Sequence, residues 1–153
     1  MITALNVGNN ILKRAFAENI DITPMKLQKL IYCVYKEYYK KTQRALFDER
    51  FEAWKYGPVL RSVYDSFKYC GANAIKKYHT DSKGEAFCVS EVNSSIFLES
   101  LDKVWKKYKN YDGLVLSAFT HAPNTAWRKA IDSKRAYLKD EDILQEEEFF
   151  FVQ

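Results

Sequence analysis

Glycine and histidine are scarce in this chain, and their scarcity argues against several kinds of chemistry. The sequence has 153 residues, of which only five are glycines and two are histidines. The glycines are too scattered for a Walker-type phosphate loop or a dinucleotide-binding fingerprint, because both motifs need closely spaced glycines. We therefore expect no nucleotide cofactor.

Neither histidine lies in a recognisable catalytic or metal-binding pattern. His79 stands in a lysine-rich loop with no Asp or Glu at ligand spacing, which favours a solvent-facing residue. His121 follows Ser117, so Ser-His chemistry is one alternative, but no Gly-x-Ser-x-Gly elbow or nearby acidic residue supports it. A histidine that ties a helix end to its neighbours is the favoured interpretation. We predict a protein that is not an enzyme and binds no metal or other cofactor.

Cysteines and long apolar runs are also few. Cys33, Cys70 and Cys88 form an odd set with wide spacings, which suggests neither a disulfide framework nor a zinc site. No run approaches the roughly 18 apolar residues of a membrane span. The N-terminus lacks the pattern of a secretory signal. We expect a cytoplasmic protein without a membrane partner.

The composition and the hydrophobic periodicity predict one mainly α-helical domain over residues 1–153. Hydrophobic residues make up 47% of the chain and aromatic residues 16%, which is typical of a packed globular protein. Apolar residues recur at helical spacing in several segments. These segments predict a compact bundle of about five to seven helices, at 5–19, 24–42, 58–70, 95–108, 112–119 and 123–131.

A short β element is expected beside these helices. Residues 51–56 have an extended character and are stopped by Gly57 and Pro58. Residues 86–90 are a candidate second strand, which could pair with the first.

The net charge of +4 hides an uneven distribution. Six acids and no Lys or Arg lie in the tail 140–153, which leaves the rest of the chain at +10. Such a chain could bind an acidic partner, bind nucleic acid, or fold its tail back onto its own basic face; the remaining alternative is a solvated charge distribution with no partner. Lysines cluster at 26–41 and 103–109, but no helix-turn-helix or RNA-binding motif accompanies them, so we do not expect nucleic acid to be the direct target.

The segment from Trp54 to Val59 is the best candidate for a partner-binding surface. Trp and Tyr are frequent interface anchors, and Gly57 with Pro58 would fix the backbone around Trp54 and Tyr56. The alternative is that Trp54 packs inward and the turn is only structural.

Several sequence blocks together resemble a known family. The blocks KLQKLIY (26–32, preceded by Met25), LFDERFEAWKYGPV (46–59), LSAFTH (116–121) and AW (126–127) occur in the order seen in the Panacea antitoxin domain of SocA-like and phage-associated GepA-like proteins. The family pattern has Pro-Trp after Thr-His, whereas this chain has Ala126 before Trp127 and a proline at 123 instead. That difference concerns the geometry of the loop.

The resemblance implies an antitoxin of a toxin-antitoxin system that neutralises a cognate protein toxin by direct binding. Such proteins are paired with a toxin encoded beside them, and a homo-oligomer or a toxin-antitoxin hetero-oligomer is possible. Two alternatives are an adaptor that delivers the toxin to an ATP-dependent protease and a nucleic-acid-binding regulator. The expected partner-binding residues are Trp54, Tyr56, Gly57, Pro58, Arg61, His121, Trp127, Asp140, Glu141 and Asp142.

Overall fold

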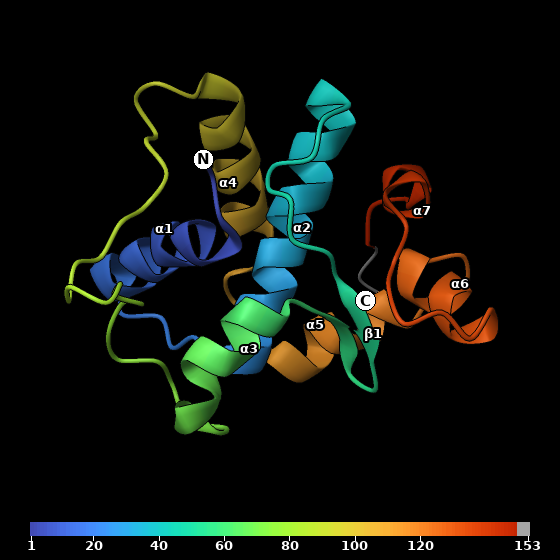
Figure 1. The fold of residues 1–153 in the computed structure, drawn as a ribbon, viewed down its shortest axis with the longest axis horizontal. Helices are drawn as coiled ribbons and strands as arrows, with labels where there is room; N and C mark the ends of the chain where they lie inside the picture. Colours follow the sequence, from blue (N-terminus) through green and yellow to red (C-terminus); the bar gives the residue numbers. More distant parts are fainter. Residues whose placement is uncertain (150–153) are drawn as a thin grey trace.

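The computed structural model describes residues 1–149, which form a mainly helical fold with one small β-hairpin on one side (Figure 1). Seven α-helices are present in this part of the chain, so the predicted fold class is confirmed. The elements in chain order are α1 (Ala4–Glu18), α2 (Pro24–Thr42), β1 (Glu52–Trp54), β2 (Gly57–Val59), α3 (Arg61–Phe67), the 3-10 turn η1 (Lys68–Cys70), α4 (Ser95–Tyr108), α5 (Gly113–Thr120), α6 (Ala126–Asp132) and α7 (Asp140–Gln145). No helix within residues 1–149 combines the length and the apolar character needed to cross a membrane.

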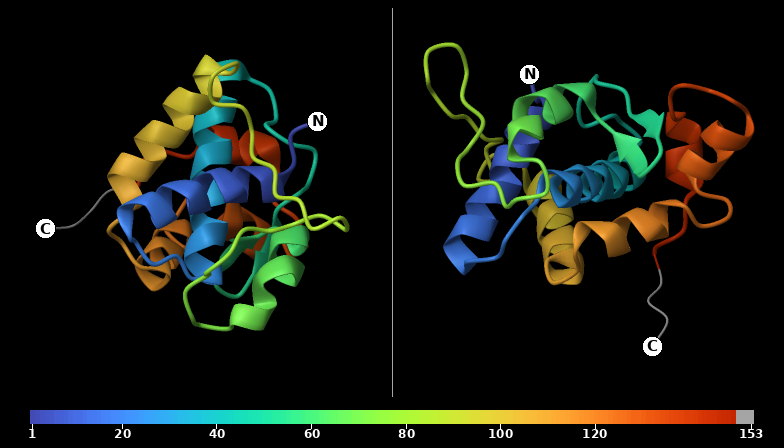
Figure 2. Two further views of the ribbon diagram at one scale, coloured as in Figure 1. Left: turned by 90° about the vertical axis from the view of Figure 1, so that its left-hand side faces the viewer. Right: turned by 90° about the horizontal axis from the view of Figure 1, so that it is seen from below.

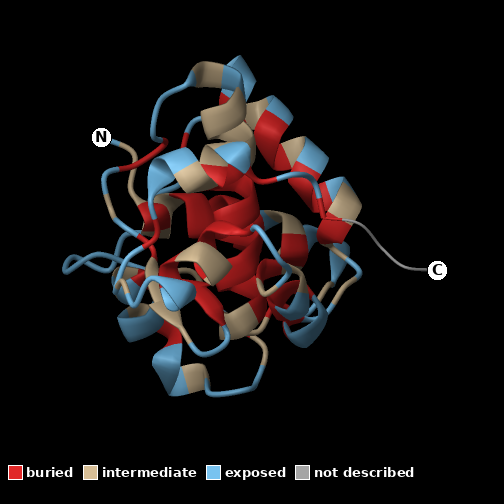
Figure 3. Cartoon of the chain, turned by 90° about the vertical axis from the view of Figure 1, so that its right-hand side faces the viewer, coloured by how far each residue is buried: buried red, intermediate tan, exposed pale blue. Residues whose placement is uncertain are grey.

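Helix α2 is the central element of the fold. Its start follows from the sequence, because the Thr23 hydroxyl accepts a hydrogen bond from the Lys26 N–H and Pro24 occupies the first turn. It ends at Gln43, which adopts a left-handed conformation (φ 58°). The other helices α1, α3, α4, α5 and α7 and the strand β2 all contact α2, and the buried residues gather around it (Figures 1 and 3).

This central position buries several lysines of α2. Lys26, Lys29 and Lys36 are each at most 5% exposed, although they fall outside the apolar stripe on the helical wheel. Neighbouring elements cover that side of the helix as well, so the wheel alone does not show which positions are in solvent. Each buried ammonium group therefore needs a partner inside the protein.

The predicted extended segment forms the first strand of a two-stranded antiparallel hairpin. Glu52 pairs with Val59, and Trp54 pairs with Gly57 across the turn. Gly57 has a φ of +112°, a backbone conformation that residues with a side chain rarely adopt. A Cβ atom at this position would lie 2.5 Å from the Thr120 hydroxyl oxygen, so the close approach of α5 also requires glycine.

The predicted strand at 86–90 is wrong. Within the described residues this segment pairs with no strand; it lies in the long connection 71–94, which runs beside α1 (Figure 2). Two side chains of α1 occupy its backbone groups instead. Asn10 exchanges two hydrogen bonds with the main chain of Val89 (2.9 and 2.8 Å), and Asn9 donates to the Phe87 carbonyl (2.8 Å). Asparagine side chains thus take the place of a β-ladder.

Candidate partner-binding site around the hairpin

The backbone of the hairpin and its continuation is held by side chains from three helices. Five carbonyl groups between residues 54 and 60 each accept a hydrogen bond from a side chain of another element. The pairs are Trp127 Nε1 to the Trp54 carbonyl (2.6 Å), His121 Nε2 to Lys55 (3.0 Å), the Ser117 hydroxyl to Tyr56 (2.5 Å), Lys29 Nζ to Pro58 (2.8 Å) and Gln28 Nε2 to Leu60 (3.0 Å). Gln28 Oε1 also accepts from the Leu60 N–H (2.9 Å).

These donors come from sequence blocks that are far apart in the chain. Gln28 and Lys29 lie on α2, Ser117 lies on α5, His121 caps the end of α5, and Trp127 lies on α6. The three sequence blocks KLQKLIY, LSAFTH and AW therefore all contact the backbone of the hairpin or of its continuation. Because their polar groups are used to fix the main chain, we conclude that these residues position the hairpin.

His121 has the structural role that the sequence favoured. Its ring packs edge-on against Trp127, with ring centroids 3.9 Å apart, and its carbonyl accepts hydrogen bonds from the Arg128 guanidinium (3.3 and 3.0 Å). Burial, followed by the charges of Arg128 and Lys29, lowers the pKa of His121, while the bond to Lys55 opposes this shift. The imidazole is therefore neutral at pH 7, and the bond to a carbonyl requires the proton on Nε2.

Ser117 and His121 do not form a nucleophile-base pair. The Ser117 hydroxyl donates to the Tyr56 carbonyl, and His121 Nε2 donates to the neighbouring carbonyl of Lys55. A Ser-His mechanism would need the serine hydroxyl to donate to the imidazole, whereas here it donates to a backbone carbonyl. Within residues 1–149, no group of three His, Cys, Asp or Glu side chains is arranged to hold a metal ion.

The outward side of the hairpin carries aromatic and charged side chains. Tyr56 is 50% exposed and Lys55 is also exposed. Trp54 is partly buried between Tyr64 of α3, at a ring-centroid distance of 4.8 Å, and the Arg61 guanidinium, whose carbon lies 4.6 Å from the Trp54 ring. Arg61 in turn pairs with Glu52 (3.2 Å).

The expected site residues outside the acidic tail thus separate into two groups. Trp54, Tyr56 and Arg61 lie together on the outer side of the hairpin, whereas Gly57, Pro58, His121 and Trp127 form or support its inner side. The sequence reasoning missed Gln28, Lys29, Ser117 and Tyr64. The signal for the first two was available, since both polar residues fall inside the KLQKLIY block.

A groove runs beside the outer face of the hairpin. It has a volume of about 380 Å³ and is bounded by the start of α2, by the hairpin turn and by α3. Its lining is mainly apolar and aromatic, from Pro24, Met25, Trp54, Tyr56, Val59 and Tyr64. The buried Lys29 belongs to the same lining.

Lys29 is an unusual component of such a groove. Its side chain is 1% exposed, and its ammonium group has one hydrogen-bond partner, the Pro58 carbonyl. No carboxylate within residues 1–149 forms an ion pair with it. Burial lowers the pKa of Lys29 from 10.5 to about 7, because the charged form is poorly solvated there.

The acidic tail, up to residue 149, folds back onto the basic body of the protein. Asp140 accepts a hydrogen bond from Tyr35 (2.7 Å), and Asp142 pairs with Arg135 (3.3 Å), whereas Glu141 is exposed. Residues 150–153 of the predicted tail lie outside the described part of the chain. The described part of the tail thus contacts the chain's own basic residues, which was one of the alternatives for the uneven charge.

The strongest tail contact is made by Glu146, which is 3% exposed. Its carboxylate forms a buried ion pair with Lys36 (3.1 Å) and accepts hydrogen bonds from the Tyr32 hydroxyl and from the Ala126 N–H (2.8 Å). Burial raises the pKa of Tyr32, so its hydroxyl remains a donor. Glu146 therefore joins α2, α6 and the tail.

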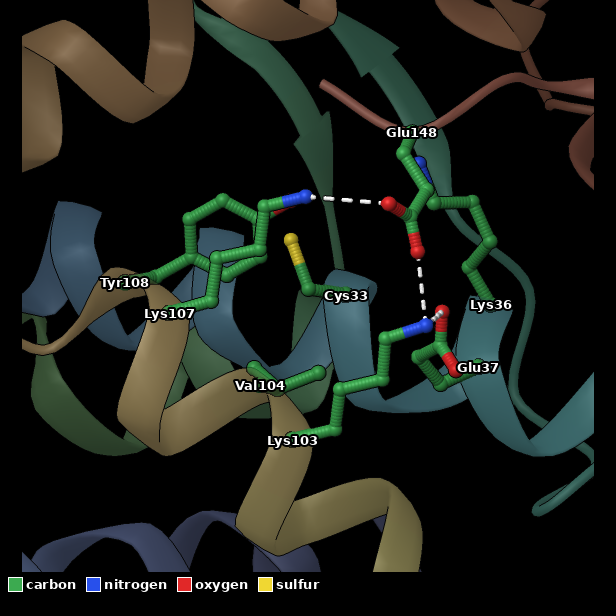
Figure 4. Close-up of a pocket in the computed structure, with 8 residues that line it drawn as sticks. All are labelled: Cys33, Lys36, Glu37, Lys103, Val104, Lys107, Tyr108 and Glu148. Carbon is green, nitrogen blue, oxygen red and sulfur yellow. Dashed lines mark hydrogen bonds and ion pairs between the residues drawn. The ribbon is translucent and has the colours of Figure 1, made fainter. Parts of the chain in front are cut away.

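The neighbouring Glu148 neutralises part of the lysine cluster on α4. It pairs with Lys103 (2.6 Å) and Lys107 (3.4 Å) beside a small cavity that also contains Cys33 (Figure 4). The bond from Lys103 lowers the pKa of Glu148. Lys109, the residue that follows the C-terminal end of this helix, pairs with Glu18 (2.8 Å). These pairings leave a weaker basic surface than the sequence suggests, which does not favour nucleic acid as the target.

The chain is similar to known antitoxins over most of its length. A family model described as the antitoxin SocA-like Panacea domain matches residues 27–128. Antitoxin SocA from Caulobacter vibrioides (strain NA1000 / CB15N) is 32% identical over 131 residues, which cover 82% of this chain and 69% of the Caulobacter protein. No solved structure matches the chain. The chain therefore belongs to the SocA-like Panacea antitoxin family, as the sequence blocks predicted.

Proposed function

We propose that this antitoxin neutralises a cognate protein toxin by binding it directly, and that the outer face of the hairpin is the contact surface. Membership of the antitoxin family supports a toxin as the partner. The observation that carries the choice of surface is the set of five side-chain hydrogen bonds to the hairpin and its continuation.

Fixing the hairpin from the inside has an energetic consequence for binding. A loop that is already ordered loses little conformational entropy when a partner docks on it. The side chains left outside, Trp54, Tyr56 and Arg61, are of the three types most enriched among energetically dominant interface residues. A rigid scaffold that presents such side chains can occlude a toxin's active site without any chemistry of its own.

Co-expression with the protein encoded beside this gene tests the proposal. We expect the neighbour alone to stop growth, and this chain to restore growth and to copurify with the neighbour. Tyr56→Ala should weaken both effects. Tyr69→Ala is the matched control, because Tyr69 is 62% exposed but lies on η1 and not on the hairpin.

The outcomes separate the possible mechanisms. Growth restored through a stable complex in cells that lack ATP-dependent proteases supports direct neutralisation. Restoration that requires a protease supports the adaptor alternative. A neighbouring gene product that does not stop growth contradicts the proposed function. Equal effects of Tyr56→Ala and Tyr69→Ala contradict the proposed surface.

The acidic tail offers a second, smaller contact through the exposed Glu141. Deleting the whole tail would also remove the buried contacts of Glu146, so loss of binding could not be assigned to the surface. Glu141→Lys changes the exposed charge alone. Unchanged affinity for the toxin at low and high salt would remove the tail from the interface.

A further inference from the structure

The groove beside the hairpin combines an apolar lining with a buried lysine, Lys29, that has no anionic partner among residues 1–149. Met25, Tyr56 and Tyr64 supply apolar and aromatic walls, and Tyr56 and Tyr64 are 50% and 40% exposed. Covering exposed aromatic surface with a partner lowers the free energy of the complex. The groove volume of about 380 Å³ is large enough for an apolar side chain and its neighbours.

Lys29 gives this groove a charge preference. An ammonium group has three donors, and within residues 1–149 only the Pro58 carbonyl accepts from it. The other basic residue of the groove lining is Lys55, and no Asp or Glu of residues 1–149 belongs to the lining. A carboxylate brought into the groove would therefore lie near the exposed Lys55 and the buried Lys29, and it would meet no Asp or Glu of the described lining.

The other buried lysines of α2 show that this situation is specific to Lys29. Lys36 pairs with the Glu146 carboxylate (3.1 Å). Lys26 donates to the Lys109 carbonyl, outside the groove. Lys29 is thus the buried lysine of α2 whose charge is uncompensated next to a surface that a partner can reach.

We propose that the groove binds a segment of the toxin in which an aromatic or aliphatic residue is followed within a few residues by Asp or Glu. The apolar side chain packs between Met25, Tyr56 and Tyr64, and the carboxylate pairs with Lys29. This inference rests on the proposed function for the identity of the partner, whereas the ligand chemistry follows from the groove itself. Binding of the carboxylate restores the electrostatic compensation that Lys29 lacks in the free protein.

A selection experiment tests the groove without the toxin. Random peptides displayed on phage are selected on the full-length wild-type protein, and the enriched peptides are resynthesised with their carboxylates intact or replaced by amides. We expect enrichment of apolar residues close to Asp or Glu, and about tenfold weaker binding of the amide versions, the size of one charge-assisted hydrogen bond.

Two substitutions assign the charge preference to Lys29. Lys29→Met should weaken the binding of the carboxylate peptides about tenfold, so that they bind no more tightly than the amide peptides. Lys26→Met is the matched control, since Lys26 is also a buried lysine of α2 bound to a carbonyl, and it should leave the advantage intact. Because the carboxylate-to-amide comparison uses the wild-type protein, it remains decisive even if Lys29→Met disturbs the hairpin.

The results distinguish failure of this inference from failure of the proposed function. Peptides without acidic residues, or equal binding of acids and amides, would overturn the inference whatever the toxin does. A second copy of this chain bound in the groove, seen as self-association that Lys29→Met abolishes, would also overturn it. Acid-dependent peptide binding together with a neighbour-encoded protein that does not bind would support the groove chemistry and contradict the proposed partner.

Discussion

The buried Lys29 should make the stability of the fold depend on pH in a particular direction. Its pKa is about 7 in the folded protein and 10.5 in a solvated reference. Between these values the unfolded chain binds one more proton than the folded chain, so the free energy of unfolding rises with pH. Below pH 7 the full cost of a buried charge is present, and above pH 10.5 it is absent.

The size of this effect follows from the two pKa values. Each pH unit well inside the interval contributes up to about 1.4 kcal/mol. From pH 7 to pH 9 the contribution of Lys29 is about 2 kcal/mol, because the folded protein is still half-protonated at the lower limit. Lys29→Met removes this dependence, and it also removes the pH-independent hydrogen bond to the Pro58 carbonyl, worth about 1 kcal/mol.

Urea denaturation followed by circular dichroism at pH 7 and pH 9 measures the effect. Burial raises the pKa of Cys33 to about 12, so ionisation of this thiol in the unfolded chain lowers stability above pH 9. That contribution is common to both proteins and cancels in the difference between wild type and Lys29→Met. A difference that grows by about 2 kcal/mol in favour of the wild type supports the account. Parallel pH profiles would refute it.

Three further predictions concern the packing that holds the hairpin and the tail. Glu146→Gln should lower the free energy of unfolding by about 3 kcal/mol, measured by urea denaturation, because it leaves the buried Lys36 ammonium without its ion-pair partner. The double substitution Glu146→Gln with Lys36→Met should recover part of this loss, because it removes the unpaired charge. Gly57→Ala should lower the melting temperature more than Gly84→Ala, since both glycines have positive φ but only the first would also clash with its surroundings; equal shifts would contradict this. The Cys33 thiol should react with a thiol reagent only after unfolding, as a fast reaction in the native protein would show that it is neither buried nor protonated.

Local sequence signals were sufficient for the central helix and for the first strand. Thr23 and Pro24 marked the start of α2, and the apolar spacing marked its length. Gly57 and Pro58 marked the end of the first strand, although they begin the second strand and the next helix starts only at Arg61. These features depend on neighbours in the chain, which is why they could be predicted.

The remaining features depend on contacts between distant residues. The missed helix α7 has acidic residues in its first turn and packs through Ile143, a pattern too short to give a helical period. The segment at 86–90 was assigned to a strand because its competing partners, Asn9 and Asn10, lie on α1. The burial of Lys29 was not predictable from a helical wheel, since it results from the hairpin packing onto the polar side of α2.

For the candidate site, the sequence named residues of the hairpin but not the contacts that hold the hairpin in place. Trp54 and Tyr56 were chosen as side-chain types common in interfaces. The sequence could not show that Ser117, His121 and Trp127 all bind the backbone of the same hairpin, because that convergence is set by the packing of α5 and α6.

Hydroxyl-radical footprinting of the toxin complex tests the central claim most directly, because it reports the solvent exposure of individual aromatic side chains. Tyr56 and Tyr64 lie at the proposed surface, whereas Tyr69 and Phe87 are exposed elsewhere and serve as internal controls. The account predicts that oxidation of Tyr56 and Tyr64 falls when the toxin binds, while oxidation of Tyr69 and Phe87 is unchanged. A stable complex that leaves Tyr56 and Tyr64 fully reactive would contradict it.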